Sequence, residues 1–343
     1  MCIAPCGMLG HHKRNVNFYL KQNMINQTKE VFFKKTLIDP LTKESIQHIH
    51  KNDILFKCST KYPIINGIPI NIDDTESVFN INDIITQKNT TQDSSYREKS
   101  LKNIIRQKIL PSLSKDFNFI KRYKKLAEKH RNGKILIIGA GDKIEWYNSI
   151  FNDKSLVITS DVHTQFNPDI VVDCHQIPFA NESFDLVIAG QVLEHTFKPW
   201  VVAKEVERIV KTNGNILIEI PFNFPYHSPP YDFFRFTFTG LRSLFTKCNL
   251  NDFEVTEGNA SSVAVYSSQF LIELSSYRYI RMLMLFISRF LFGWFKYIDL
   301  LYKKPTIRNI TMPKGFSMTF EKDNLKRNNS DLLSEFYEIK NKS

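Results

Sequence analysis

The sequence contains few cysteines, and their arrangement does not suit a disulfide framework. The five of them are scattered along 343 residues and are odd in number. They are Cys2, Cys6, Cys58, Cys174 and Cys248. A disulfide-stapled secreted domain would show an even, regularly spaced set, so the pattern predicts a reducing compartment and a cytoplasmic protein. Cys2 and Cys6 stand near His11 and His12, a potential metal-ligand set, but we interpret residues 1–28 as a tail.

A signal peptide and an uninterrupted apolar span are also missing. In the first residues, MCIAPCGMLGHHKR, a short apolar run is followed by the positive charges, the reverse of the order in a signal peptide. A strongly apolar stretch at 279–304 is interrupted by Arg289, Lys296 and Asp299. It is not the uninterrupted apolar run that a bilayer demands, so we expect no membrane-spanning helix.

The composition is that of a globular protein with excess positive charge. Hydrophobic residues make up 42% and charged residues 24%, which excludes a disordered chain. The formal net charge of +11 favours an anionic partner such as nucleic acid, an acidic membrane surface or a phosphorylated substrate. Lysine is abundant throughout the chain, which explains the charge equally well, so charge alone selects none of these partners.

The N-terminal third predicts a small module followed by a linker. Residues 29–74 contain short strands and turns, and we expect a small β-rich module there. Residues 75–110 combine a polar linker with the start of a helix, because helical spacing runs from Leu101 to His130.

Short apolar runs alternate with helical stretches through the rest of the chain. The expected strands are 134–141, 155–161, 169–173, 184–190, 214–221, 253–258 and 315–322, the last of them antiparallel. A helix with apolar positions between 201 and 210 is expected to close at Gly214. Strands that alternate with helices predict an open α/β sheet with parallel crossovers. Ligands bind such sheets at the carboxyl ends of the strands, where we therefore look for chemistry.

Two glycines and an aspartate suggest a cofactor site at that edge. Gly139 and Gly141 follow the first strand directly, where glycine lets the backbone approach a ligand. Asp161 closes the second strand, and its carboxylate could accept both hydroxyls of a ribose. The third glycine of a dinucleotide fingerprint is absent, because that position is Ile144. These residues suit NAD and S-adenosylmethionine equally.

The next segment separates the two cofactors. It contains Asp173, then Ile177-Pro178-Phe179, Ser183-Phe184-Asp185 and Leu193-Glu194-His195 in order. This series resembles the type-11 branch of the class I S-adenosylmethionine-dependent methyltransferases, over roughly residues 115 to 258. The resemblance implies a Rossmann-like seven-stranded sheet of order 3-2-1-4-5-7-6, within a domain spanning 111–323.

The resemblance also implies roles for individual residues. Gly139 and Gly141 would face the methionine part of S-adenosylmethionine and Asp161 its ribose. Asp173 and Cys174 would lie at the adenine, and Gln191 near the sulfonium. Two positions depart from the family pattern. They are Ile137, where an acidic residue is common, and Lys143, where a third glycine is usual.

The acceptor side offers candidate catalytic residues. Methyl transfer from a sulfonium needs mainly positioning, with a general base when the acceptor is an oxygen. The candidates are His195, His227, Asp232 and Arg235. His195 could instead pack at a helix start. Arg235 could bind a phosphate or carboxylate, or could form a structural salt bridge to Asp232.

The loop after the fifth strand has two resemblances. Ser228 to Tyr231 read Ser-Pro-Pro-Tyr, a signature of enzymes that methylate base amines, but in those enzymes it follows strand four or precedes the glycine motif. The segments 225–227, 232–237 and 240–245 are similar to a group of type-11 methyltransferases associated with cell-surface glycans. The second resemblance fits the position of the loop, so nucleic acid becomes the lesser alternative.

Two flanking segments complete the organisation. We expect a helical, amphipathic insertion at 263–305, before the last strand, and a tail at 324–343. The polar positions of the insertion fall on one helical stripe: Arg281, Ser288, Lys296, Asp299 and Lys303. The stretch 279–304 suits a membrane interface, and equally a cap over the active site or a dimer seam.

The N-terminal module resembles a zinc-ribbon-like domain found with some methyltransferases. Its four ligand positions are Asp39, Thr42, Cys58 and Lys61 here. One cysteine cannot build a tetrahedral site, so we expect no metal.

The leading hypothesis is an S-adenosylmethionine-dependent methyltransferase acting on a small-molecule or glycan acceptor, at oxygen, peripheral on an anionic membrane. A nucleic-acid methyltransferase, favoured by the basic stretch Lys121 to Lys134, and a non-catalytic cofactor-binding scaffold or activator are the alternatives.

Overall fold

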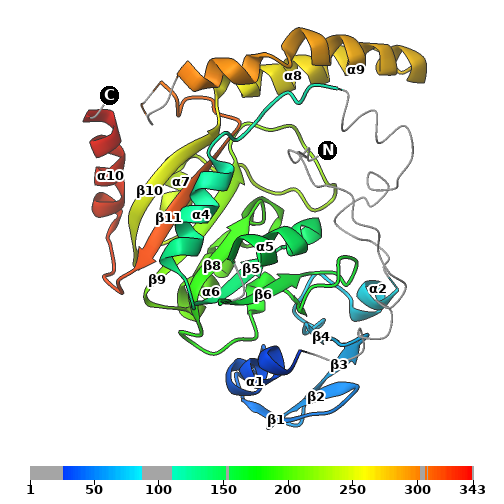
Figure 1. The fold of residues 1–343 in the computed structure, drawn as a ribbon, viewed down its shortest axis with the longest axis vertical. Coiled ribbons are helices and arrows are strands. Elements are labelled where there is room, and N and C mark those ends of the chain that lie inside the picture. Colours follow the sequence, from blue (N-terminus) through cyan, green and yellow to red (C-terminus); the bar gives the residue numbers. More distant parts are fainter. Residues whose placement is uncertain (1–25, 87–109, 152–153, 302–305, 307, 342–343) are drawn as a thin grey trace.

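The computed structural model describes residues 26–86, 110–151, 154–301, 306 and 308–341. One mixed sheet of 11 strands runs through the molecule (Figure 1). The strands are β1 (Ile46–Ile49), β2 (Asp53–Phe56), β3 (Lys61–Ile65), β4 (Ile68–Asn71), β5 (Lys134–Ile138), β6 (Leu156–Asp161), β7 (Ile170–Val172), β8 (Phe184–Gly190), β9 (Val210–Pro221), β10 (Cys248–Glu257) and β11 (Gly315–Lys322).

The centre of the sheet is parallel. The strand order is β1-β2-β3-β4-β7-β6-β5-β8-β9-β11-β10. From β4 to β9 all neighbours are parallel, whereas β11 is antiparallel to both β9 and β10. The predicted α/β class with parallel central strands is confirmed. The apolar runs Ile135–Ile138 and Leu186–Ala189 are fully buried, as expected for strands covered on both faces.

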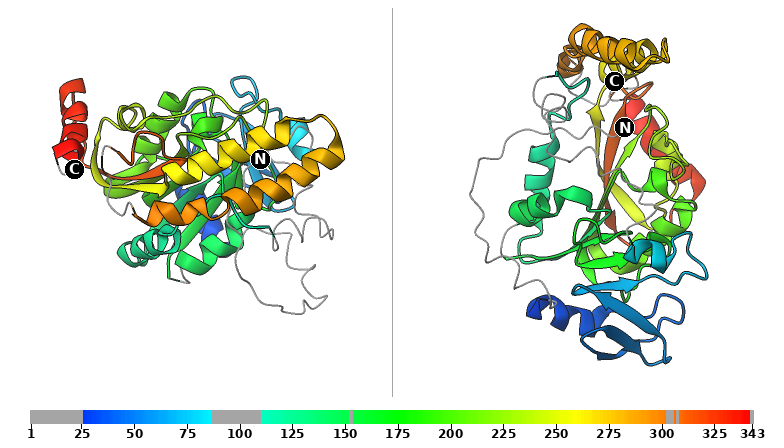
Figure 2. Two further views of the ribbon diagram at one scale, coloured as in Figure 1. Left: turned by 90° about the horizontal axis from the view of Figure 1, so that it is seen from above. Right: turned by 90° about the vertical axis from the view of Figure 1, so that its right-hand side faces the viewer.

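Helices cover both faces of this sheet (Figures 1 and 2). The α-helices of the described ranges are α1 (Gln27–Thr36), α2 (Ile81–Ile85), α4 (Phe119–Lys129), α5 (Ile144–Phe151), α6 (Pro199–Ile209), α7 (Phe238–Arg242), α8 (Asn259–Glu273), α9 (Arg278–Phe292) and α10 (Asn329–Asn341). Short 3-10 turns are η3 (Gly141–Lys143), η4 (Cys174–Gln176), η5 (Leu193–His195) and η6 (Phe295–Leu301). Tyr123 of α4 and Tyr147 of α5 belong to one core cluster, whereas Phe33 of α1 and Val202 of α6 belong to the other.

Two helix boundaries differ from the sequence prediction. Helix α6 ends at Ile209 and β9 begins directly at Val210, so Gly214 lies within a strand. Helix α4 begins at Phe119, while residues 110–118 are not helical. Asp116 there accepts the N–H of Asn118 (2.9 Å), a turn that competes with an earlier helix start. The expected helical residues 101–109 lie outside the described part of the chain.

Within the segment 324–343, predicted as a C-terminal tail, the residues Asn329–Asn341 form helix α10. Arg242 of α7, fully buried, donates to the Glu335 carboxylate, and the rings of Phe238 and Phe336 lie 6.0 Å apart. The helix therefore packs on α7 through a buried ion pair and apolar contacts, which a polar sequence pattern does not reveal.

The N-terminal module extends the sheet, because β4 pairs in parallel with β7. Asp39, a position where the zinc-ribbon resemblance expects a ligand, is buried and accepts hydrogen bonds from Leu41, Thr42 and Thr60. The Sγ of Cys58 lies 2.6 Å from Oγ1 of Thr60. Hydrogen bonds to one aspartate thus connect the turns of the module.

Helices α8 and α9, which follow β10 and precede β11 in the chain, lie against each other across one end of the molecule (Figure 2). Three residues of the expected polar stripe, Ser288, Lys296 and Asp299, point inward. Ser288 bonds Ser268, Lys296 donates to the carbonyl of Ser112, and Asp299 accepts backbone N–H groups at the start of α8. The pair therefore presents apolar side chains outward. None of the helices in the described ranges combines the length and hydropathy needed to cross a bilayer.

Candidate functional site

The glycine turn after β5 is held by close backbone contacts. Gly139 and Gly141 have φ values of +65° and +53°, which glycine adopts without steric cost. A Cβ on Gly139 would lie 2.6 Å from Cγ2 of Val192, so a side chain has no room there. The N–H of Ala140 donates to the carbonyl of Ser160 (2.9 Å), which ties the turn to β6.

Asp161 lies at the carboxyl end of β6, beside this turn. Its carboxylate accepts the N–H groups of Gly141 (2.9 Å) and Val162 (2.8 Å). The side chain is buried, so these hydrogen bonds fix it next to the backbone that the glycines leave open. The structure thus brings Gly139, Gly141 and Asp161 together at one edge of the sheet.

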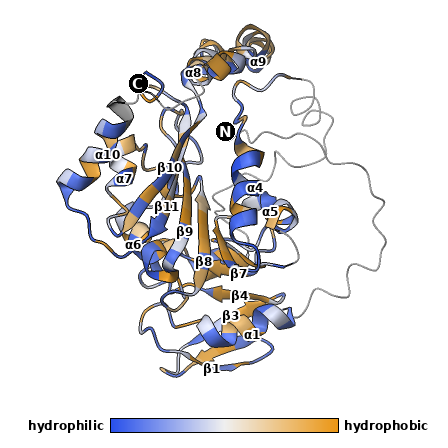
Figure 3. Cartoon of the chain, turned by 60° about the vertical axis from the view of Figure 1, so that its left-hand side comes forward, coloured by the Kyte–Doolittle hydropathy of each residue, from blue (hydrophilic) through white to orange (hydrophobic). Residues whose placement is uncertain are grey.

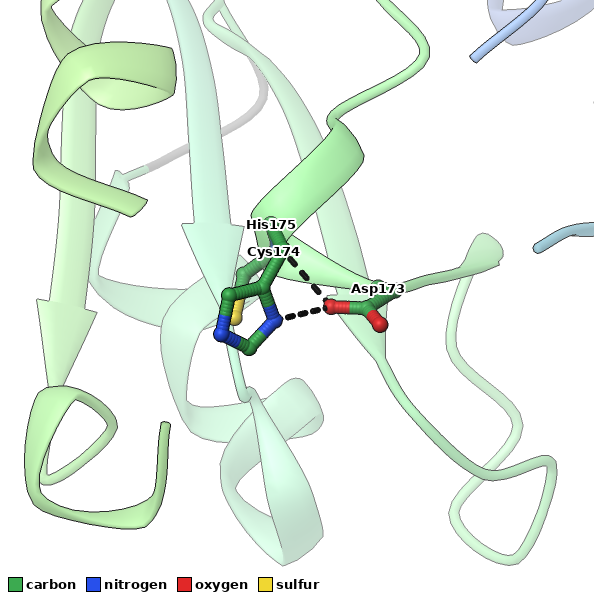
Figure 4. Close-up of side chains that lie close together, drawn as sticks. All are labelled: Asp173, Cys174 and His175. Carbon is green, nitrogen blue, oxygen red and sulfur yellow. Dashed lines mark hydrogen bonds and ion pairs between the residues drawn. The ribbon is translucent and has the colours of Figure 1, made fainter. Parts of the chain in front are cut away.

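Asp173 follows β7 and caps η4. Figure 4 shows the ring of His175 turned toward its carboxylate, with Nδ1 2.6 Å from Oδ1. The N–H of His175 donates to the same oxygen (2.9 Å), and the hydroxyl of Ser77 donates to Oδ2 (2.5 Å). Burial raises the pKa of Asp173, but hydrogen bonds from His175 and Ser77 outweigh burial and hold that pKa below its usual value. Asp173 is therefore an ionised group near neutral pH.

The Ser77 contact belongs to a segment that the sequence analysis treats as linker. Next to Ser77, Phe79 stacks on Tyr231 (5.5 Å) and meets the ring of His163 edge-on (6.1 Å). Phe79, His163 and Tyr231 line a small pocket together with residues of α2. The linker thus lies over the carboxyl ends of β6 and β7 and contacts the acceptor loop.

Cys174 and Gln191 have different surroundings. Cys174 is buried, and burial raises the pKa of its thiol well above the usual value. Gln191 is exposed after β8 with φ +59°, and its N–H donates to the carbonyl of Glu219 (2.8 Å). Cys174 therefore offers its backbone rather than a thiolate, whereas Gln191 presents its side chain to solvent at the sheet edge.

The loop after β9 is fixed by an ion pair. The guanidinium of Arg235 donates to both oxygens of Asp232 (2.6 and 2.8 Å) and to the carbonyls of Phe224, Phe234 and Pro225. A guanidinium has five N–H donors, and these contacts occupy all of them. Of the two roles expected for Arg235, the structure shows the structural salt bridge to Asp232. Arg235 therefore holds the loop in place, and its N–H groups are not free to bind an anionic substrate.

His195 and His227 meet at this loop. Their ring centroids lie 4.8 Å apart, and the Nδ1 of His195 contacts the carbonyl of Tyr231 (2.5 Å). Burial, with His195 nearby, lowers the pKa of His227 to about 4, and burial lowers the pKa of His195 as well. Both rings are thus neutral at pH 7, and His227 is a weak base for removing a proton from an acceptor.

Glu194 is a site residue that the sequence does not reveal. It lies within the Leu-Glu-His motif, but its burial is invisible in the sequence. Its side chain is 0% exposed, and burial raises its pKa to about 8. Its backbone carbonyl accepts the N–H groups of Phe233 (2.8 Å) and Phe234 (3.1 Å), so the loops after β8 and β9 are joined here.

Comparison with solved structures returns many chains that are similar over part of their fold. A phosphoethanolamine N-methyltransferase 2 from Haemonchus contortus is 13% identical over 61% of this chain and 53% of its own, with a TM-score of 0.38. The YcgJ protein from Bacillus subtilis is 13% identical over 59% of this chain and 97% of its own, with a TM-score of 0.35. Identities and TM-scores this low carry no information on substrate or reaction.

Sequence comparison gives one informative match. No curated protein sequence matches the chain significantly. Residues 152–218, from the start of β6 into β9, match the family model described as a methyltransferase domain. This match, at the part of the sheet that holds Asp161, Asp173 and Glu194, supports a class I methyltransferase, an enzyme whose cofactor is S-adenosylmethionine.

Proposed function

We propose that this protein transfers the methyl group of S-adenosylmethionine to an oxygen of a small-molecule or glycan acceptor, at the surface of an anionic membrane. One observation carries the proposal. The turn of Gly139 and Gly141 and the carboxylates of Asp161 and Asp173 follow three adjacent parallel strands, at the same edge of the sheet. Ligands bind open α/β sheets at this edge.

The acceptor would bind beside that edge, at the loop after β9. Strands β8 and β9 are parallel neighbours, so the loops that bear His195 and His227 leave the sheet side by side. The rings of Phe79 and Tyr231 stack between this loop and the linker. The similarity of segments 225–227 and 232–237 to glycan-associated methyltransferases supports a sugar-type acceptor.

Replacing Asp161 with alanine is expected to weaken binding of S-adenosylhomocysteine about 10- to 100-fold. The change removes a buried carboxylate, and a hydrogen bond to a charged group contributes about 1.5 to 3 kcal/mol. Isothermal titration calorimetry of wild type and variant gives the two dissociation constants. The variant's circular dichroism spectrum shows whether the turn and the sheet remain folded.

Asp74→Ala is the matched control, because Asp74 is an exposed aspartate at the end of the N-terminal module. It should bind S-adenosylhomocysteine like wild type. If wild type shows no binding at millimolar ligand, the methyltransferase proposal fails. If wild type and Asp161→Ala bind S-adenosylhomocysteine with equal affinity, the cofactor does not bind at the end of β6.

The membrane part of the proposal depends on the outer surface of α8 and α9. Apolar side chains that face solvent there include Phe270, Leu274, Tyr277, Tyr279, Leu283, Phe290, Leu291 and Trp294. Tyr279 is 85% exposed, and Figure 3 shows apolar stretches along both helices at one end of the molecule. Exposed Arg278 and Arg281 stand among them, which suits anionic headgroups.

The intact protein is expected to float with liposomes that contain anionic lipid and to stay in the dense fraction with neutral liposomes. Leu283→Glu combined with Phe290→Glu should reduce the floated fraction several-fold, because each change places a charge on the apolar surface. Sucrose-gradient flotation measures both results. Leu325→Glu, at an exposed apolar position away from these helices, should float like wild type. Failure of the wild-type protein to float would remove membrane binding from the proposal and leave methyl transfer untouched.

A further inference from the structure

Three side chains that can bind metal converge at the edge of the sheet where β8 and β9 end. Glu194 and His195 belong to η5, directly after β8, and His227 belongs to the loop after β9. One carboxylate oxygen and one ring nitrogen from each histidine all lie within 4.8 Å of one another. The Nε2 of His195 is 3.8 Å from Oε1 of Glu194.

The polar atoms of this cluster are buried and lack hydrogen-bond partners. Glu194 is 0% and His227 2% exposed. Within the part of the chain that the structure describes, neither carboxylate oxygen of Glu194 and not the Nε2 of His227 has a hydrogen-bond partner. Buried polar groups are nearly always paired, and leaving one unpaired costs about 1 to 3 kcal/mol. Glu194 and His227 thus bring unpartnered buried atoms to one cluster of potential ligands, which points to a ligand that the protein itself does not supply.

The opposite nitrogen of each ring has acceptors. The Nδ1 of His195 faces the carbonyl of Tyr231. The Nδ1 of His227 is 3.2 Å from the carbonyl of Pro225 and 3.2 Å from Oδ2 of Asp232. Arg235 also lies 3.2 Å from that nitrogen, but its donors are already bonded to Asp232 and to backbone carbonyls. For His227, two acceptors against one committed donor favour Nδ1–H, and for His195 the carbonyl of Tyr231 favours it. Each Nε2 then keeps its lone pair free for a ligand.

This arrangement is typical of histidines that ligate metal. Such histidines donate their other N–H to a carboxylate or a backbone carbonyl, which fixes the tautomer and orients the ring. Asp232 and the carbonyl of Tyr231 occupy those outer positions here. The ion pair of Arg235 and Asp232 thereby gains a role, because it holds the carboxylate that orients His227.

The second group of potential ligands in the described chain lacks these features. Asp173 and His175 are hydrogen-bonded to each other (2.6 Å), and the Nε2 of His175 accepts the N–H of Lys198 (3.1 Å). Burial keeps the thiol of Cys174 protonated by raising its pKa. The side-chain oxygens and nitrogens of Asp173 and His175 in Figure 4 are thus paired within the protein, whereas the carboxylate of Glu194 and the Nε2 of His227 have no partner among the described residues.

We propose that Glu194, His195 and His227 bind a divalent transition-metal ion through one carboxylate oxygen and two Nε2 atoms. Two imidazoles and a carboxylate suit Zn²⁺, Fe²⁺ or Co²⁺, whereas Mg²⁺ prefers oxygen ligands alone. Bonds of about 2 Å require ligand atoms about 3.3 Å apart, so the side chains close slightly around the ion. This proposal departs from the expectation of no metal. The sequence does not suggest the site, because its ligands come from two loops and His195 and His227 are 32 residues apart in the chain.

Three protein ligands leave coordination positions open beside the acceptor loop. An oxygen of the acceptor can occupy one of them, and the ion would then position that oxygen and stabilise its negative charge. Only this use of the ion rests on the proposed methyl transfer. Metal binding itself is independent of it, so the two can fail separately.

Binding is tested on the full chain after removal of metals with a chelator. Titration with Zn²⁺ by calorimetry should show one ion bound per chain, with Mg²⁺ at least 100-fold weaker, and Co²⁺ should give the visible absorption of a site with nitrogen ligands. Loss of a residue that only hydrogen-bonds to a metal ligand weakens metal binding about 10- to 100-fold, so loss of a ligand itself should weaken it more. Glu194→Gln and His227→Gln, which remove direct ligands, should each weaken Zn²⁺ binding by about 100-fold or more.

Control variants separate this site from other histidines. His48→Asn with His50→Asn changes two neighbouring rings 4.4 Å apart, and His11→Asn with His12→Asn changes the N-terminal pair; both should leave this ion bound. Glu194→Gln keeps the side-chain shape without a carboxylate, and its melting curve without metal reports folding. His195→Gln, at a partly exposed ring, serves as a second ligand variant. The proposal is overturned if wild type binds no Zn²⁺, if the ligand variants bind it as wild type does, or if only the control variants lose it.

Discussion

Gly139→Ala is expected to abolish binding of S-adenosylhomocysteine and to lower the free energy of unfolding by about 2 to 5 kcal/mol. Gly139 has φ +65°, a conformation that costs other residues about 1 to 2 kcal/mol. The new Cβ would lie 2.6 Å from Cγ2 of Val192, and overpacking of this kind costs about 1 to 3 kcal/mol. Val192 precedes η5, so relief of the clash would displace Glu194 and His195. Urea denaturation and calorimetric titration measure the two effects.

Val192→Ala separates the two causes. In the double variant Gly139→Ala with Val192→Ala the clashing methyl group is gone, so the double variant should lose only the part due to the backbone conformation. Gly240→Ala is the matched control, because Gly240 lies in α7 and its nearest contact is the Thr237 hydroxyl at 3.1 Å. Its stability should change by less than about 1 kcal/mol. Unchanged stability and ligand affinity in Gly139→Ala would show that the turn is more plastic than its contacts indicate.

The central sheet could be predicted from the sequence because its strands are buried on both faces. Ile135 to Ile138 and Leu186 to Ala189 form continuous apolar runs, which are typical of parallel strands covered on both faces. The position of Asp161 follows from the same logic, since a residue that closes a parallel strand lies at the ligand-binding edge. These predictions need only the order of elements along the chain.

Contacts between distant segments could not be predicted in this way. The hydroxyl of Ser77 reaches Asp173 across 96 residues of sequence, from a segment whose polar composition indicated only a linker. A single helical stripe through 279–304 was expected, but α9 ends at Phe292 and η6 begins at Phe295, and helical periodicity does not say which side of a helix faces the protein. Lys296 and Asp299 point inward because they bond Ser112 and the start of α8. Glu194 became a candidate ligand only when its burial without a partner was known.

Arg122→Met is expected to lower the free energy of unfolding by about 3 to 5 kcal/mol, the usual cost of removing one partner from a buried ion-pair network. Arg122, in α4, is 6% exposed and donates to carboxylates of Asp116, Glu219 (2.6 Å) and Glu254 (2.7 Å). Without the guanidinium, the carboxylates of Asp116 and Glu219 stay buried with no cation beside them. Glu219 stands in β9 next to Gly190 at the site, so we expect cofactor affinity to fall as well. Urea denaturation measures the stability change.

The same helix provides the control and tests the nucleic-acid alternative. Lys125 forms an ion pair with Asp252 (3.3 Å) in which both side chains are largely exposed, so Lys125→Met should change stability by less than about 1 kcal/mol. Adding Glu219→Gln to Arg122→Met removes one orphaned charge and should restore part of the loss. A stability change in Arg122→Met no larger than in Lys125→Met would mean that the network is not closed to solvent. Arg122 belongs to the basic stretch 121–134 that favoured a nucleic-acid substrate, but its guanidinium is buried and paired with internal carboxylates. The basic surface of this stretch is therefore weaker than the sequence suggests.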